Sequence, residues 1–353
     1  MKTSFTICLA FVAGIGIIAF SPLQEPVLCI IAAAGLCTAG ASLLLASQRG
    51  RKRNALLLAA FCAGAFASAS ALISISGSSQ MPPLPAKANA ALLQHIDSRQ
   101  LSGQSTALIK ALIMGERAEL SQEVVEAFRA AGASHILALS GLHVGIIYGI
   151  LSALLSPLGG SKQALWIKSV AGILFTAFYM VMTGASASVV RAFIFICLHC
   201  IARLLPERKS SGTSTIAISA IIQLSINPLY IKQLGFQLSY LAVLGISLIF
   251  PFLRDWYPEG KSFDPIRKIW TSAAMGISCQ VFTAPLVLLH FGTFPKYFLI
   301  SNLIALPLTE LFIIITIVDL SLCGMGVDLE ITKSLVERLG QTLVYCLEIV
   351  ASI

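Results

Sequence analysis

The chain contains 353 residues, of which 57% are hydrophobic and only 11% are charged, whereas about 25% charged residues are typical of a soluble domain. Together with a mean hydropathy of +0.87, this composition excludes a soluble globular protein and indicates a polytopic membrane protein. The formal net charge of +8 comes mainly from lysines and arginines that flank apolar runs, so it does not by itself indicate nucleic-acid binding.

Long apolar runs account for most of the sequence, and ten or eleven of them approach the roughly 20 residues with which a helix crosses a bilayer. They lie at about 4–20, 27–47, 54–75, 136–156, 165–183, 188–205, 213–227, 234–253, 269–290 and 297–323, with a weaker run at 339–353. No segments alternate as the strands of a membrane barrel do, and lipid offers open backbone groups no partner. We therefore expect an all-α fold with about ten or eleven transmembrane helices.

Basic residues predict the orientation of these spans. Four lysines and arginines at 49–53 lie between the second and third runs, which places that loop and the N-terminus in the cytoplasm. Alternation then puts residues 76–134 outside and Lys333 and Arg338 inside. The first run is followed by a Ser-Pro pair rather than a small-residue cleavage site, so we expect it to remain as the first helix.

The chain divides into four parts. Residues 1–75 hold three spans rich in Ala, Gly and Ser, which allow helices to pack closely. Residues 76–91 form a linker rich in Ser, Gly and Pro. Residues 92–134 interleave apolar and charged side chains and predict a pair of amphipathic helices on the outer face. Residues 135–353 stay in the membrane to the end of the sequence.

The nine cysteines lie almost entirely inside apolar runs, where we expect small buried side chains. Cys197 and Cys200 have the spacing of a metal-ligand pair, but no second pair accompanies them. We therefore expect no metal and no other cofactor.

Four motifs in a fixed order resemble those of the ComEC-type competence proteins, the inner-membrane channels for transforming DNA. The motifs are MGER at 114–117 with FRAAG at 128–132 and HILALSGLH at 135–143; TGASAS at 183–188 with Arg191; Asn227-Pro228 with GFQLS at 235–239; and QVFTAP at 280–285 with HFG at 290–292 and NLIALP at 302–307. The resemblance covers residues 92–310 and implies a DNA path. The candidate residues for this path are His135, Ser140, Gly141, His143, Ser186, Ser188, Arg191, Asn227, Gln237, Gln280, Asn302 and Glu310.

The chain departs from the family pattern in two places. Members similar to it carry an oligonucleotide-fold domain before the amphipathic helices and a metallo-β-lactamase-like nuclease domain at the C-terminus. The linker at 76–91 is too short for a five-stranded barrel, and the five histidines form no His-x-His-x-Asp-His cluster. Metal-assisted hydrolysis needs metal ligands, so we expect no enzymatic activity here and degradation of a DNA strand by another polypeptide.

Ser140 and His143 are the first candidates for contact with DNA. They are three residues apart and are predicted to share a helix face that looks into the bundle, whereas His135 is turned about 80° away, near the outer mouth. Gly141 and Gly145 are four apart and offer a close-packing groove. The structural alternative is a buried histidine that bonds a serine or a backbone carbonyl between helices.

Arg191 is expected just inside the outer end of its span, one turn beyond Ser186 and Ser188. A permanent cation there would meet a phosphate, since a passage for single-stranded DNA needs cations for the backbone and aromatic faces for the bases. The alternative for Arg191 is snorkelling to the lipid headgroups. The aromatic candidates, for which packing is the commoner role, are Tyr148, Phe236, Tyr240, Phe282, Phe291 and Phe294.

Polar groups also interrupt two later runs. Asn227 and Gln237 belong to a short, broken span that we expect to be re-entrant or pore-lining, because free backbone groups in a membrane must face protein or a cavity. Glu310 on the last long span is expected to accept a hydrogen bond from Asn302 or to pair with Arg191.

Two other functions use the same residues. A proton-coupled secondary transporter would titrate His143 and Glu310, but its internal inverted repeat is not visible. An intramembrane hydrolase would use Ser140 as nucleophile, yet His143 on the same turn is poorly placed to take its proton and no oxyanion-hole loop is evident.

The sequence therefore favours a channel core in the bacterial inner membrane that passes single-stranded DNA inward and recognises its backbone. No phosphate-cradling Gly-x-x-x-x-Gly-Lys loop is present, so a separate motor is implied, together with a separate DNA receptor and nuclease. Membrane lipids are the other expected partner, and the sequence leaves a homo-oligomer open.

Overall fold

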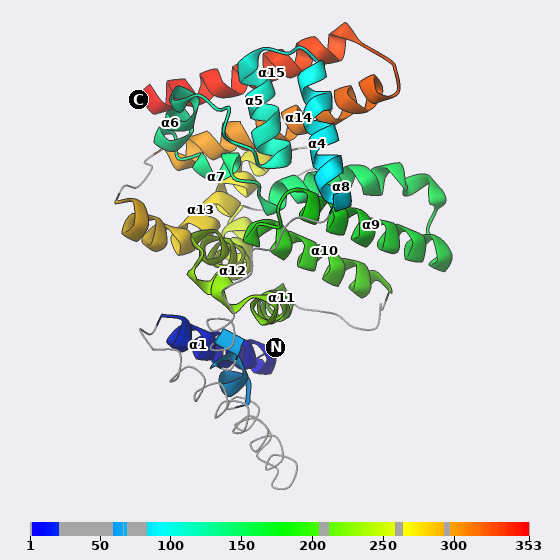
Figure 1. The fold of residues 1–353 in the computed structure, drawn as a ribbon. Coiled ribbons are helices and arrows are strands. Elements are labelled where there is room, and N and C mark those ends of the chain that lie inside the picture. The colour runs from blue at the N-terminus through cyan, green and yellow to red at the C-terminus, as the bar shows by residue number, and fades with distance from the viewer. Residues whose placement is uncertain are drawn as a thin grey trace, which may run out of the picture. The chain divides into compact units, whose positions relative to one another are not determined.

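The computed structural model describes residues 2–20, 59–65, 67–68, 83–204, 212–257, 264–292 and 297–352. These residues are almost entirely helical and contain no strand, which confirms the predicted all-α fold (Figure 1). They form two compact units. One comprises Met1–Gln80 and Ile194–Ser247, and the other comprises Met81–Phe193 and Leu248–Ile353.

Five helices in the described part of the chain are long and apolar enough to cross a membrane. They are α9 (Lys162–Met182), α10 (Ala187–Leu204), α12 (Leu234–Asp255), α13 (Pro265–Phe291) and α14 (Phe298–Gly324). Three further apolar helices are shorter, namely α1 (Lys2–Ala19), α8 (Gly141–Leu154) and α11 (Gly212–Ile226). The chain is thus an all-α polytopic membrane protein. The predicted span at 27–47 and the basic loop at 49–53 lie outside the described residues.

In the first unit, α1 packs against α11 and crosses a helical segment at 59–65. The crossing is reciprocal: a Cβ added to Gly14 would collide with the Phe61 carbonyl oxygen, and one added to Gly64 would collide with the Phe11 carbonyl oxygen. Glycine at both positions therefore lets the two backbones touch, as small residues do between membrane helices.

The second unit contains the region for which a pair of amphipathic helices is predicted, and this region is more divided than expected. It forms α4 (Pro83–Ser98), α5 (Gly103–Ile109), the π-helix η1 (Lys110–Met114), α6 (Gln122–Ala130) and α7 (Ser134–Leu137). The α4 helix begins inside the predicted linker at 76–91. Serine N-caps explain two of the breaks, since the hydroxyls of Ser102 and Ser121 accept backbone N–H groups at the starts of α5 and α6.

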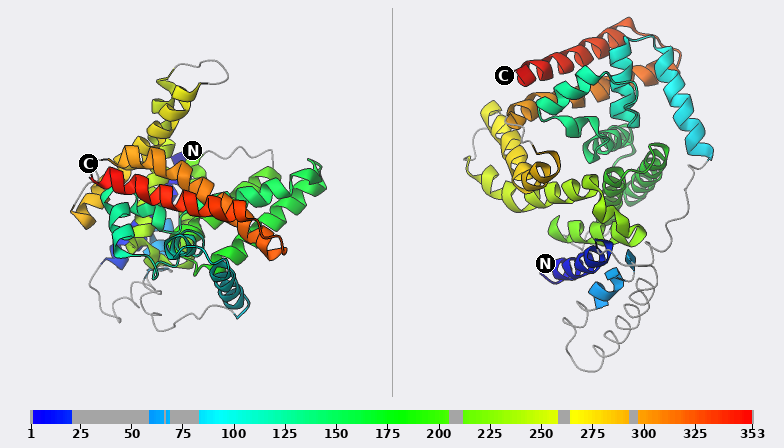
Figure 2. Two further views of the ribbon diagram at one scale, coloured as in Figure 1. Left: turned by 90° about the horizontal axis from the view of Figure 1, so that it is seen from above. Right: turned by 60° about the vertical axis from the view of Figure 1, so that its left-hand side comes forward.

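Helix α14 lies side by side with α15 (Glu330–Ser352), and α4, α5 and α6 pack against this pair (Figures 1 and 2). We call the assembly of α4, α5, η1, α6, α14 and α15 the charged lobe. Its core is apolar: Phe128 of α6, Leu108 of α5, Phe312 of α14 and Leu343 of α15 are fully buried.

Buried ions join the parts of the charged lobe. The Arg99 guanidinium donates two hydrogen bonds to the Asp319 carboxylate, at 2.9 and 2.8 Å, and a third to Asp328 at 2.7 Å. Lys110 pairs with Asp97 and Glu119, and the hydrogen bonds that its ammonium group donates to these two carboxylates raise its pKa.

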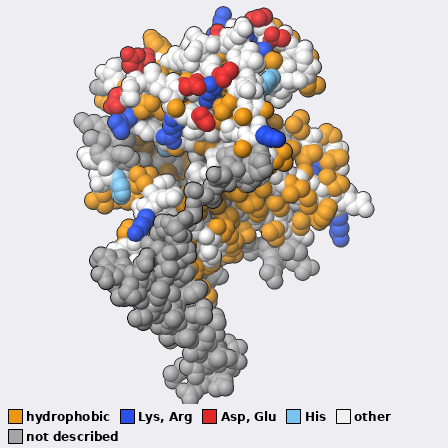
Figure 3. Space-filling view, in the orientation of Figure 1, with side chains coloured by type: hydrophobic (Ala, Val, Ile, Leu, Met, Phe, Trp, Pro, Cys, Tyr) orange, Lys and Arg blue, Asp and Glu red, His pale blue; other side chains and the backbone are white. Residues whose placement is uncertain are grey.

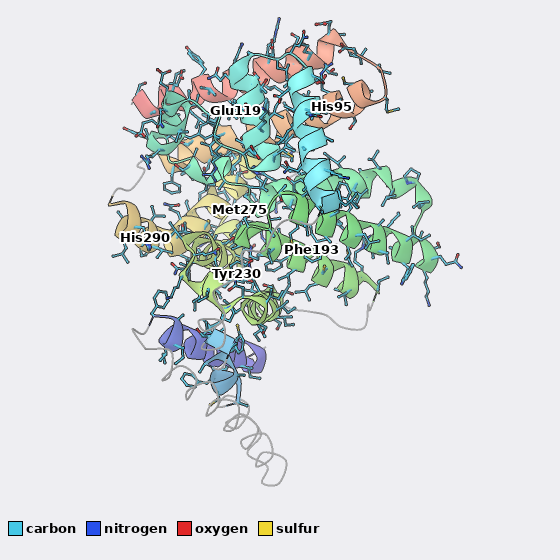
Figure 4. The ribbon with its side chains drawn as sticks, viewed as in Figure 1. His95, Glu119, Phe193, Tyr230, Met275 and His290 are labelled. Carbon is cyan, nitrogen blue, oxygen red and sulfur yellow. The ribbon has the colours of Figure 1, made fainter. Side chains whose placement is uncertain are left out.

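Neighbouring contacts reinforce these attachments. His95 of α4 lies against α14, with its Nε2 2.9 Å from the Leu320 carbonyl, and Glu119 lies in the connection before α6 (Figure 4).

These contacts contradict one part of the predicted topology. The sequence places residues 76–134 outside and the segment after α14 inside. In the structure Arg99 pairs with Asp328 across 2.7 Å, and the Ser102 N–H donates to Glu337 at 2.9 Å. Side chains in direct contact lie on the same side of a membrane, so the alternation fails between these two segments.

Three long helices carry an internal proline: Pro251 in α12, Pro285 in α13 and Pro307 in α14. Proline has no N–H to donate to the carbonyl four residues earlier. Each of these helices therefore lacks one hydrogen bond of its ladder, which membrane helices tolerate where neighbouring helices or polar side chains supply new partners.

Candidate functional site

The motif around Ser140 forms a helix start instead of a continuous helix. Helix α7 ends at Leu137, Ala138 is extended, and α8 begins at Gly141 with Ser140 as its N-cap. The predicted run at 136–156 is interrupted here because serine before glycine favours an N-cap over a helix interior. Ser140 and His143 therefore do not lie side by side on a helix face as predicted.

His143 and Ser140 form a capping box. The Ser140 hydroxyl accepts the Leu142 N–H at 3.2 Å, and the Ser140 N–H donates to His143 Nδ1 at 3.4 Å. The histidine, which is 1% exposed, thus takes the part that Glu or Gln usually plays. His143 is therefore a buried histidine that bonds a serine, as the structural alternative expected, but the bond lies within one helix start and not between helices. His135 on α7 is exposed.

Arg191 lies against the first turn of α8. A Cβ added to Gly141 would lie 3.2 Å from the Arg191 guanidinium and 3.6 Å from the Ala192 methyl group. Glycine at position 141 makes room for this approach, whereas no described residue lies within 4 Å of a Cβ added to Gly145, which forms no close-packing groove with the described part of the chain. Arg191 is 8% exposed, so a permanent cation is buried beside the N-terminus of a helix.

A tight turn places the start of α10 at this site. After α9, Gly184 and Ala185 adopt left-handed φ angles of 79° and 50°, and the Ala185 N–H donates to the Met180 carbonyl at 2.8 Å. The exposed Ser186 precedes α10 and its carbonyl accepts the Val190 N–H. Ser188 lies in the first turn, so Ser186, Ser188 and Arg191 occupy the same end of α10, as predicted.

The end of α9 is fixed from outside by Asn89 of α4, whose side-chain amide donates to the Met182 carbonyl at 2.9 Å. This contact joins the charged lobe to the turn that precedes α10.

Helices α13 and α14 carry the later candidates of the second unit. Gln280 of α13 is half-buried. On α14, Asn302 Oδ1 and the Thr309 hydroxyl are buried and lack a hydrogen-bond partner among the described residues. Glu310 is half-buried and makes neither predicted contact within the described chain: Asn302 is eight residues away, about 12 Å along the helix, and Arg191 is turned toward Gly141.

The candidates in the first unit have local structural roles. Asn227 Oδ1 accepts the Leu229 N–H at 3.0 Å and starts the short 3-10 helix η3 (Pro228–Lys232), while the Gln237 amide donates to the Ile231 carbonyl at 2.7 Å. These bonds satisfy the backbone of the broken span.

The aromatic candidates are mostly engaged in packing. Tyr240 bonds Ser219 and Gln223, and its ring centroid is 4.5 Å from that of Phe236. Tyr148 packs against Gly172. Phe282 is half-buried. The Phe291 side chain and all of Phe294 lie outside the described residues.

Three buried ions were missed at the sequence level, namely Arg99, Lys110 and Asp319. Asp319 interrupts an apolar run, and an ionisable residue in such a run is itself a signal that its position matters. Its partner Arg99, by contrast, is not marked by any pattern.

The fold and the site define a polytopic α-helical membrane protein with a buried cation beside a helix N-terminus. Residues 112–353, more than half of the chain, match the family model described as Competence protein. The chain belongs to this competence protein family. No solved structure matches it.

Three curated relatives match about half to three fifths of the chain. The chain is 30% identical over 208 residues to ComE operon protein 3 of Bacillus subtilis (strain 168), which is 59% of this chain and 25% of the relative. It is 27% identical over 176 residues to Competence protein ComA of Neisseria gonorrhoeae, which is 48% of this chain and 25% of the relative. It is 26% identical over 216 residues to Recombination protein 2 of Haemophilus influenzae (strain ATCC 51907 / DSM 11121 / KW20 / Rd), which is 59% of this chain and 27% of the relative. The chain thus spans about a quarter of the length of these relatives.

Proposed function

We propose that this chain forms a membrane core through which single-stranded DNA passes inward during competence. The observation that carries the proposal is Arg191, a buried guanidinium held against the first turn of α8 through Gly141. The N-terminus of a helix is itself electropositive, so two positive groups face each other. A phosphate between them would be favourable to both, and the DNA backbone supplies one at every nucleotide.

The other polar groups have supporting roles in this proposal. His135, Ser186 and Ser188 surround the two helix starts and offer hydrogen bonds to phosphate oxygens. The Ser140 and His143 pair shapes the α8 terminus. Gln280, Asn302 and Glu310 extend the polar path along α13 and α14, and Asn227 and Gln237 hold the broken span in the first unit.

The remaining parts of the proposal concern partners and location. The chain acts in the bacterial inner membrane with its N-terminus in the cytoplasm and without enzymatic activity of its own. A separate receptor, nuclease and cytoplasmic motor deliver, degrade and pull the DNA, and copies of the chain are free to associate.

Transformation of the organism that carries the gene tests the proposal. A chromosomal deletion is complemented with the wild type or with Arg191→Ala, Arg191→Lys or Arg129→Ala, and membrane levels are matched by immunoblot. We expect the deletion to abolish uptake and Arg191→Ala to lower it roughly tenfold or more, the factor for about 1.5 kcal/mol from one charged hydrogen bond. Lysine should restore part of the uptake because it keeps the charge but not the planar fork.

Arg129 is the matched control because, among the described residues, its exposed side chain pairs with Glu126 on the same helix alone. Its replacement should leave uptake unchanged. Normal transformation in the deletion strain would refute the proposed function.

A further inference from the structure

Both ends of α14 are attached to the same segment of the charged lobe. Near the N-terminus of α14, the Ser301 hydroxyl donates to the Ala131 carbonyl at the end of α6. Near its C-terminus, Asp319 binds Arg99, which follows α4. The two attachments are about 27 Å apart along the helix, close to the roughly 30 Å of hydrocarbon that a span must cross. If α14 crossed the membrane, the segment from Arg99 to Ala131 would have to cross beside it.

The charges of the lobe exclude that arrangement. Arg129 next to one attachment is 65% exposed and Asp328 next to the other is 64% exposed. Between them, Gly340 of α15 packs against Phe312 of α14, which brings the exposed Arg338 near the middle of α14. Figure 3 shows acidic and basic side chains spread across the lobe from end to end. Exposed ions avoid hydrocarbon, so the whole length of the lobe faces water.

The opposite face of α14 is a continuous apolar stripe. At 100° per residue, its exposed hydrophobic side chains fall on one side of the helix, away from the buried Ser301, Thr309 and Asp319. The stripe consists of Ile300, Ile304, Leu311, Ile314 and Val318. A helix with a water-facing charged partner on one side and an apolar stripe on the other has the pattern of an interfacial helix.

The start of α14 also does not run back along α13. The Leu299 side chain lies 3.6 Å from where a Cβ added to Gly276 would be. Gly276 is about 22 Å along α13 from the end of that helix at Phe291. Two antiparallel spans joined by a short loop would instead bring Leu299 next to the last turn of α13.

We infer that α14 does not cross the membrane but lies along one surface of it, with its apolar stripe in the acyl chains and the rest of the charged lobe above it in water. The partner of the stripe is the bilayer, because spans of the same chain hold the lobe against it. The inference does not rest on the proposed role in DNA transport, but it places the α14 candidates Asn302 and Glu310 at the membrane surface and not within the bilayer.

Cysteine labelling tests the inference directly. In a variant without its native cysteines, Met325→Cys at the end of α14 and Glu123→Cys on α6 are exposed to a membrane-impermeant maleimide in intact cells and in inverted vesicles. We expect both to be labelled from the same side. Gly160→Cys and Ser186→Cys, at the two ends of α9, are the reference for a true span and should be labelled from opposite sides. Labelling of positions 325 and 123 from opposite sides would overturn the inference.

A depth measurement checks the same point without relying on accessibility. Ile304→Cys, Leu311→Cys and Val318→Cys carry a fluorophore in phosphatidylethanolamine–phosphatidylglycerol vesicles that contain nitroxide lipids, with thermal melting used to confirm folding. An interfacial α14 gives the same shallow depth at all three positions. A deep position 311 between shallow positions 304 and 318 means that α14 crosses, and the inference is then wrong.

Discussion

At the scale of single residues, the contact between Gly141 and Arg191 allows effects on function and on stability to be measured separately. Gly141→Ala places a methyl group 3.2 Å from the guanidinium, which must shift, while alanine in a helix stabilises the fold by about 0.5–1 kcal/mol relative to glycine. We expect transformation to fall several-fold with melting in detergent unchanged or raised. Gly145→Ala makes the same change in helix propensity, and no described residue lies within 4 Å of the added methyl group, so uptake should stay at the wild-type level. Equal uptake in the two variants would mean that the position of Arg191 is unimportant.

His143 offers a second test at this scale. Glutamine can replace a histidine that caps a helix, but it cannot replace a histidine that titrates. Glutamine is a usual partner in a capping box, so we expect His143→Gln to keep uptake close to that of the wild type. His143→Ala leaves the Ser140 N–H unpaired and should cost about 1 kcal/mol of stability, measured as a lower melting temperature. If glutamine abolishes function although the protein melts normally, the histidine titrates, and the proton-coupled transporter becomes the better reading.

At the scale of elements, the buried pair of Arg99 and Asp319 holds α4 to α14. Both side chains are almost fully buried, at 3% and 2% exposure, so removal of one partner strands the other charge. We expect Arg99→Ala to lower the free energy of unfolding by about 3–5 kcal/mol. Arg129→Ala breaks an exposed pair and should cost less than about 1 kcal/mol. Chemical denaturation of both variants in micelles measures the difference, and equal costs would show that the buried pair does not hold the lobe.

The crossing of α1 with the segment at 59–65 depends on two glycines. Gly14→Ala would place a methyl group on the Phe61 carbonyl oxygen, so the helices must separate, at a cost of about 1–3 kcal/mol typical of overpacking. Gly16→Ala on the same helix meets only the end of the Ile231 side chain, at 3.6 Å, and should be tolerated. Thermal melting of the two variants is the measurement, and a Gly14→Ala protein as stable as the Gly16→Ala protein would exclude the close crossing.

At the scale of the whole molecule, an α14 that does not cross changes where the chain ends. On the proposed orientation, the basic loop at 49–53 keeps the N-terminus in the cytoplasm, and three predicted spans lead to the charged lobe outside. If each of the six apolar helices α8 to α13 crosses, their even number returns the chain to the same side, where α14 and α15 remain. We expect a tag before residue 2 to be protected from protease in spheroplasts and a tag after Ser352 to be cleaved. Protection of both tags would contradict this topology.

Much of this architecture could be predicted from composition and hydropathy. The five long apolar helices match predicted runs, and α10, for example, covers Ala187–Leu204 against a prediction of 188–205. These boundaries follow from local composition, because a helix in lipid must be apolar over its length. The topology of α14 could not be predicted in this way, since an apolar helix on the surface and one across the bilayer have similar sequences.

The candidate site shows the same division. Ser186, Ser188 and Arg191 occupy one end of α10 as their spacing requires. The approach of Arg191 to Gly141 joins residues fifty positions apart, and the pair of Arg99 with Asp319 joins residues more than two hundred apart. Periodicity reports which side of a helix a residue occupies, but not which other helix lies there.

The internal prolines of α13 and α14 have a mechanical consequence. Bending an ordinary helix sharply breaks a backbone hydrogen bond, whereas at Pro285 and Pro307 that bond is already missing. Both helices carry candidate path residues, Gln280 on α13 and Asn302 and Glu310 on α14. In the proposed passage, α13 can flex at Pro285 beside Gln280, and α14 can flex at Pro307 on the membrane surface, in neither case breaking a backbone hydrogen bond each time a nucleotide passes.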